Sequence, residues 1–159
     1  MIESKPSRAL RGLFIAAGIL ALFTGFGNMP LYGRYYIADI PGLGWSRDFF
    51  VNVQIHYLAG SMLLAIGVYA GIQYLLGRKG GIRLTRFGAI RAAVLGLALA
   101  SGVMLALRNL PGVNFPFGIH ISMNFFHMGM AVLFMFLAIG CVVGRCQWVE
   151  RPGRSDAST

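Results

Sequence analysis

The chain has 159 residues, of which 57% are hydrophobic and only 12% charged, and its formal net charge is +9. Because a soluble domain usually carries about 25% charged residues, this composition excludes an ordinary soluble domain and indicates a single membrane-embedded domain. The positive charge does not indicate nucleic-acid binding. Most of the Lys and Arg residues flank long apolar runs, where membrane lipid headgroups bind them.

Four apolar runs predict the fold. They cover residues 10–27, 49–76, 87–107 and 118–144, and a helix needs about 20 mostly apolar residues to cross a bilayer. A spanning segment must satisfy its backbone hydrogen bonds internally, so we expect four transmembrane helices in an all-α bundle. This single domain covers residues 1–159. The first run lacks a small-residue cleavage site, so we expect an uncleaved helix and not a signal peptide. No internal repeat stands out.

The basic residues predict the orientation of the helices. Eleven of the 14 Lys and Arg residues lie in the N-terminal tail, in the link between the second and third runs, and in the C-terminal tail. The positive-inside rule therefore places both termini in the cytoplasm, in a multi-pass protein of the inner (cytoplasmic) membrane.

The outer loop, residues 28–48, is rich in Tyr, Gly and Pro and contains Trp45, which is typical of an interfacial aromatic belt. At the end of this loop, "GWSRD" predicts the start of the second helix. We expect Ser46 to cap that helix and Asp48 to lie in its first turn, where a negative charge is favourable.

All three histidines of the chain, His56, His120 and His127, lie in predicted membrane segments. His120 and His127 are seven residues apart and therefore share one face of the fourth helix. His56 lies about 33 Å along its helix from the cytoplasmic end, between His127 at about 27 Å and His120 at about 37 Å. The histidines therefore cluster in the outer half of the membrane, where an ionisable side chain is a functional candidate.

Helices that present imidazoles at matched depth predict a haem with two axial histidine ligands. In this interpretation His56 is one ligand, and depth does not choose between His127 and His120 for the other. We favour His127, because it lies deeper and a haem there is better shielded from water. His120 would then hydrogen-bond a quinol hydroxyl or a haem propionate, and the reverse assignment is the alternative. Other interpretations of the histidines are helix packing and another metal or proton role.

Several further residues are candidates for cofactor contacts from the outer half of the membrane. Gly60 shares the face of His56 and would let a ligand approach the backbone, and Asn124 lies one turn before His127. The arginines on the outer side could pair with haem propionates; these are Arg34, Arg47 and Arg108. The plainer roles are helix contacts for Gly60 and Asn124 and headgroup binding for the arginines.

The four spans, the histidine at the outer end of the second span and the histidines of the fourth resemble a known family. They are similar to the cytochrome b subunits of membrane-bound formate dehydrogenases and nickel-iron hydrogenases, over nearly the whole chain at the level of topology. The resemblance implies a haem b on the periplasmic side, held by His56 and by His127 or His120. That family holds a second, cytoplasmic-side haem with a histidine of span one and a later one of span four. This chain has neither, so we expect one haem.

The resemblance also implies a function. We expect a membrane-anchor subunit of a respiratory complex that passes electrons between a quinone, menaquinone or ubiquinone, and a redox partner subunit of iron-sulphur or cytochrome c type. The chain has no Rossmann fingerprint, P-loop or iron-sulphur cysteine set, so we expect electron transfer and not catalysis by this subunit alone. The alternatives are a haem-free anchor or assembly subunit and a small transporter. The transporter is the less favoured alternative, because proton relays usually use Asp or Glu and none of the four predicted spans contains either residue.

Overall fold

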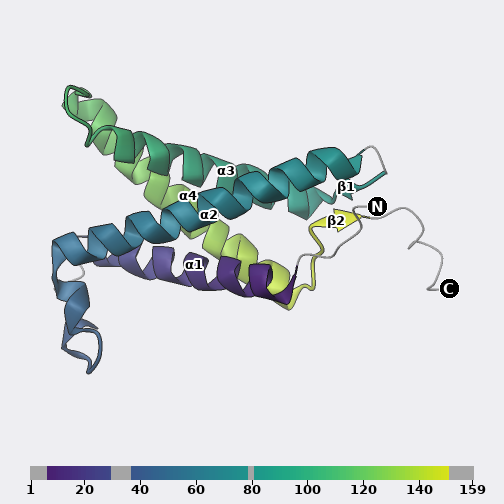
Figure 1. The fold of residues 1–159 in the computed structure, drawn as a ribbon, viewed down its shortest axis with the longest axis horizontal. Coiled ribbons are helices and arrows are strands. Elements are labelled where there is room, and N and C mark those ends of the chain that lie inside the picture. The colour runs from purple at the N-terminus through teal and green to yellow at the C-terminus, as the bar shows by residue number, and fades with distance from the viewer. Residues whose placement is uncertain (1–6, 30–36, 79–80, 151–159) are drawn as a thin grey trace. The chain divides into compact units, whose positions relative to one another are not determined.

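The computed structural model describes residues 7–29, 37–78 and 81–150 of the chain. The elements are helix α1 (Arg8–Gly27), 3-10 turns η2 (Ile37–Asp39) and η3 (Gly44–Arg47), helix α2 (Phe49–Arg78), strand β1 (Arg83–Leu84), helices α3 (Arg86–Leu107) and α4 (Phe117–Val143), and strand β2 (Val149–Glu150) (Figure 1). Within these residues, α1 to α4 are long and apolar enough to cross a membrane. The prediction of an all-α protein with four spans is therefore confirmed, and the expected bounds agree to within two residues.

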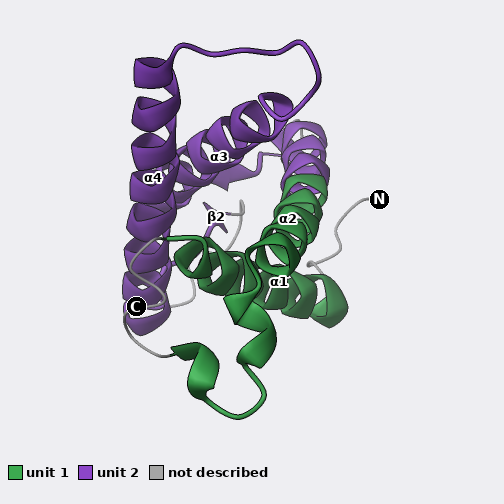
Figure 2. Ribbon diagram, turned by 90° about the vertical axis from the view of Figure 1, so that its left-hand side faces the viewer, with its two compact units in different colours: residues 1, 3–66 green, residues 2, 67–159 purple. Residues whose placement is uncertain are grey.

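The chain divides into two compact units, coloured separately in Figure 2. The first contains α1, η2, η3 and the part of α2 up to Ile66, and the second contains α2 from Gly67 onward with β1, α3, α4 and β2. His56 belongs to the first unit, whereas His120 and His127 belong to the second. Each unit therefore holds at least one of the candidate ligands.

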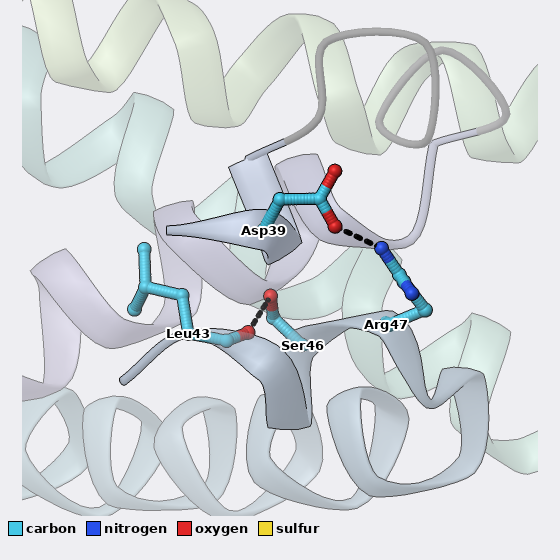
Figure 3. Close-up of polar contacts among 4 residues, drawn as sticks. All are labelled: Asp39, Leu43, Ser46 and Arg47. Atoms are coloured by element: carbon cyan, nitrogen blue, oxygen red, sulfur yellow. Dashed lines mark hydrogen bonds and ion pairs between the residues drawn. The ribbon is translucent and has the colours of Figure 1, made fainter. Parts of the chain in front are cut away.

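The start of α2 differs from the prediction. Asp48, and not Ser46, caps the helix, because its Oδ1 accepts hydrogen bonds from the amides of Phe50 at 2.8 Å and Val51 at 3.1 Å. Ser46 is buried in η3, where its hydroxyl donates to the Leu43 carbonyl at 2.6 Å (Figure 3). The physical reason is backbone geometry: Asp48 keeps the extended conformation that an N-cap requires, and the helix begins only after it.

Strands β1 and β2 form an antiparallel pair in the second unit that the sequence did not predict, with Arg83 opposite Glu150 and Leu84 opposite Val149. The pair joins the link after α2 to the segment after α4. Next to it, Arg91 is 5% exposed, and its guanidinium lies 4.0 Å from the centre of the Trp148 ring. A cation-π contact and a hydrogen bond to the Gln147 carbonyl at 3.2 Å therefore account for this buried arginine.

The helices bury few side chains against one another. In the most apolar 18-residue stretch of each helix, between 6% and 22% of the residues are buried. Large apolar side chains such as Phe125 and Phe136 are exposed on the helix surface. The buried positions are mostly small residues, among them Ala17, Ala59 and Ala98. Small residues at helix contacts and apolar residues outside are what helices packed in lipid require.

Candidate functional site

His56 is held against α1 inside the first unit. Its Nδ1 lies 3.1 Å from the Ala21 carbonyl oxygen and 3.1 Å from the Thr24 hydroxyl oxygen. The Thr24 hydroxyl donates its own proton to the Leu20 carbonyl at 2.7 Å, so its oxygen acts as an acceptor toward the ring. Because a carbonyl can only accept, Nδ1 carries the ring proton. When the imidazole of His56 is neutral, its lone pair is therefore on Nε2.

His127 is held against α3 in the same way inside the second unit. Its Nδ1 lies 2.9 Å from the Ala98 carbonyl oxygen and 3.1 Å from the Ser101 hydroxyl oxygen. The Ser101 hydroxyl donates to the Leu97 carbonyl at 2.8 Å. By the same reasoning the proton of His127 is on Nδ1 and the lone pair is on Nε2.

The two arrangements use matching segments of sequence. We call residues 20–25, LALFTG, the first anchoring segment, and residues 97–102, LALASG, the second. They are identical at four of six positions, and a hydroxyl residue stands fifth in both. Each occupies the last part of the helix that precedes a histidine-bearing helix. This six-residue likeness is too short to stand out as a repeat until the contacts to the histidines are known.

The glycine that ends each anchoring segment lets the imidazole approach the helix closely. A Cβ added at Gly25 would lie 3.2 Å from Cε1 of His56, and one at Gly102 would lie 3.0 Å from Cε1 of His127. Both distances are shorter than ordinary contact, so a larger residue would displace the ring. A Cβ at Gly18 or Gly96, on the same two helices, would meet nothing within 4 Å.

His120 has a different environment, in which hydrogen-bond donors face its ring. The Nη1 atom of Arg108 lies 2.6 Å from Nδ1 and 2.5 Å from Nε2, and the Nδ2 atom of Asn124 lies 3.3 and 3.1 Å from the same atoms. The guanidinium has no lone pair to offer, so the ring must act as the acceptor. A metal ion would compete with this cation for the His120 ring. The hydrogen-bond partners of His120 therefore differ in kind from those of His56 and His127. Asn124 and Arg108 lie beside His120.

The remaining predicted site residues are Arg34, Arg47 and Gly60, and none of the described contacts places one of them beside a histidine ring. Arg47 forms an ion pair with Asp39 of η2 on the exposed surface of the loop (Figure 3), so a carboxylate partner is already present. Arg34 lies outside the described residues. A Cβ added at Gly60 would meet nothing within 4 Å, so open space adjoins this glycine on α2.

Asn52 is a residue of this region that the sequence analysis missed. It is fully buried one turn before His56, and its Nδ2 donates to the Thr24 carbonyl at 3.0 Å and to Asn28 Oδ1 at 2.9 Å. A Cβ at Gly27 would lie 2.5 Å from the same nitrogen. Asn52 therefore ties the end of α1 to α2 beside His56. The only signal in the sequence was an amide side chain inside an apolar run.

Within residues 7–29, 37–78 and 81–150, no three His, Cys, Asp or Glu side chains gather into a site for a metal ion. A haem iron needs only two axial ligands from the protein, so two histidines can serve it. Comparisons of the chain with protein-family models, with curated proteins and with solved structures each found no match.

Proposed function

We propose that the chain is a b-type cytochrome subunit in which His56 and His127 are the axial ligands of one haem. In this proposal it is a membrane anchor in the inner membrane that passes electrons between a quinone and a redox partner subunit, near the outer face. The observation that supports the choice of ligands is the shared arrangement of the two imidazoles, each with Nδ1 against a helix carbonyl and a hydroxyl.

The donor chemistry of the two histidines fits a haem. A metal-ligating histidine usually donates its other ring N–H to a carbonyl or carboxylate, which fixes the tautomer and raises the basicity of the ligating nitrogen. Both His56 and His127 have this arrangement. Helix packing alone would need one hydrogen bond from each ring. It would not require both helix pairs to place the ring proton on Nδ1, to supply a hydroxyl acceptor and to bring a glycine close to the ring.

His120 and Arg108 support a different role at the outer end of α4. The described residues give Arg108 a histidine and no carboxylate as its partner. A guanidinium beside an imidazole suits the binding of an anionic or hydroxyl oxygen. We propose that this pair binds a haem propionate or a quinol hydroxyl, as the sequence analysis expected for the histidine that is not a ligand.

A groove between α3 and α4 supports the proposed quinone contact. Its volume is about 600 Å³, and its lining includes Leu97, Ser101, Met104, Ser122 and Phe126. The lining is mostly apolar, as a quinone ring and its isoprenoid tail require. Ser101 belongs both to this groove and to the second anchoring segment, so a molecule in the groove would lie near the residues that hold the His127 ring.

The protein's contribution in this proposal is to hold the ligands and to insulate the site. The bound haem would supply one-electron transfer. His56 and His127 would each offer a neutral imidazole with its proton held on Nδ1. The described part of α1 contains no histidine, and no histidine follows His127 in the chain, so one haem per chain is proposed.

The proposal is tested by the reduced-minus-oxidised visible spectrum of the purified protein, expressed with ample haem and with the products of neighbouring genes. We expect a b-type α-band and about one haem per chain. His56→Ala and His127→Ala should abolish the band. His120→Ala is the matched control on the same helix, and it should keep the haem. A colourless wild-type protein would sink the proposal, and loss of haem in His120→Ala with retention in His127→Ala would reverse the ligand assignment.

A further inference from the structure

We infer that the hydroxyls of Thr24 and Ser101 are positioning groups, which orient the two ligand imidazoles and strengthen them as electron donors to the iron. This inference rests on the proposed function and deepens it. It assigns a role to two residues that the sequence analysis did not single out.

The geometry of each hydroxyl directs its lone pairs at the ring. Thr24 is fully buried and Ser101 is 8% exposed, so water does not compete for either group. Each hydroxyl donates to the carbonyl four residues earlier, at 2.7 Å for Thr24 and 2.8 Å for Ser101. The proton is thereby turned along the helix, and the oxygen is left to accept from Nδ1 of the facing histidine.

Two acceptors fix the orientation of a ring better than one. Ala21 and Thr24 stand three residues apart, which is about one turn of α1, and both lie 3.1 Å from Nδ1 of His56. A ring bonded to the carbonyl alone could pivot about that bond. The shared hydrogen bond to the hydroxyl restrains the pivot, and Gly25 leaves just enough room for the ring edge.

The same hydrogen bonds act on the electronic properties of the ligands. Donation from Nδ1–H raises the basicity of Nε2, and a more basic ligand stabilises ferric over ferrous iron. Removing a hydroxyl leaves the carbonyl contact of Nδ1 in place, so the ligand should still bind. The ferrous form should then become easier to reach. A net hydrogen bond of about 0.5–1.5 kcal/mol corresponds to an increase of about two- to thirteenfold in the ratio of reduced to oxidised haem at a fixed ambient potential.

The test uses Thr24→Val and Ser101→Ala, which remove the hydroxyls, and Thr24→Ser and Ser101→Thr, which keep them. Ser61→Ala is the matched control, because Ser61 is exposed on α2 and no hydrogen bond of the described structure joins its hydroxyl to His56 or His127. Haem content, the midpoint potential from a redox titration, and the EPR spectrum of the ferric protein are measured for each. EPR g-values of low-spin bis-histidine haem respond to the orientation of the rings.

We expect Thr24→Val and Ser101→Ala to raise the midpoint potential and to move the g-values, while the conservative variants and Ser61→Ala match the wild type. Haem loss in the hydroxyl-free variants, with retention in Thr24→Ser and Ser101→Thr, would also support the positioning role. If the hydroxyl-free variants keep the wild-type potential and g-values, or if only their thermal stability changes, the inference is wrong and the cytochrome proposal stands. A wild-type protein without haem instead refutes the proposed function itself.

Discussion

Substituting Gly102 by alanine should push the imidazole of His127 away from α3. The added Cβ would lie 3.0 Å from Cε1, whereas ordinary van der Waals contact begins at about 3.4 Å. The ring must therefore retreat by about 0.4 Å. If it retreats along its hydrogen bond, the distance from Nδ1 to the Ala98 oxygen grows from 2.9 Å to about 3.3 Å, beyond the usual range for N–H···O bonds.

The size of the effect follows from two opposing contributions. Alanine in place of glycine inside a helix stabilises it by about 0.5–1 kcal/mol. Weakening the hydrogen bond of His127 costs about as much, so the two contributions should cancel at Gly102. They should not cancel at Gly96 on the same helix, where a Cβ meets nothing within 4 Å. Gly96→Ala should therefore be more stable than Gly102→Ala by about 1 kcal/mol.

Thermal unfolding of the purified variants in one detergent measures this difference. For a chain of this size, 1 kcal/mol corresponds to about 2–4 °C in Tm. Gly18→Ala and Gly25→Ala provide a second pair on α1, with a smaller difference of the same sign because the contact at Gly25 is 3.2 Å. A Gly102→Ala protein that is stabilised as much as Gly96→Ala would refute the close contact between Gly102 and His127.

Three further predictions concern the parts of the chain that frame the site. Asp48→Ala removes the cap of α2 and should cost about 1 kcal/mol in thermal unfolding, whereas Asp39→Ala breaks only an exposed ion pair and should cost well under 1 kcal/mol; equal losses would contradict the assignment of the cap. Trp148→Ala removes the ring that contacts Arg91 and helps to hold the segment after α4 in place. Hydrogen exchange should therefore become faster at the amide of Thr85, which donates to the backbone carbonyl of residue 148, and should stay unchanged in the middle of α4. A fluorescent protein fused to the C-terminus should fluoresce and a fused alkaline phosphatase should be inactive, because both termini are proposed to be cytoplasmic; the opposite pair of results would invert the orientation.

Much of the fold could be predicted from the sequence because a membrane span is a local property. Length and hydropathy alone located all four helices to within two residues, since each span must satisfy its own backbone. The choice of cap was less predictable. Ser46 and Asp48 are both good capping residues, and only the path of the chain through η3 decided between them.

The candidate site could be predicted in part. The sequence by itself determined that three histidines lie in apolar helices and that two of them share one face of the fourth span, because composition and helical periodicity are sufficient for that. It favoured His127 over His120 as a ligand only by depth in the membrane, and it left the reverse assignment open. It also left Thr24, Ser101, Gly25 and Gly102 indistinguishable from other small residues of the spans.

Only the tertiary structure decided how each imidazole is held. The atoms that contact Nδ1 of His56 and His127 belong to residues 26 to 35 positions away in the chain, on the preceding helix. The position of a ring proton depends on which acceptor lies within about 3 Å. No periodicity within a single helix carries that information, because it arises where two helices meet.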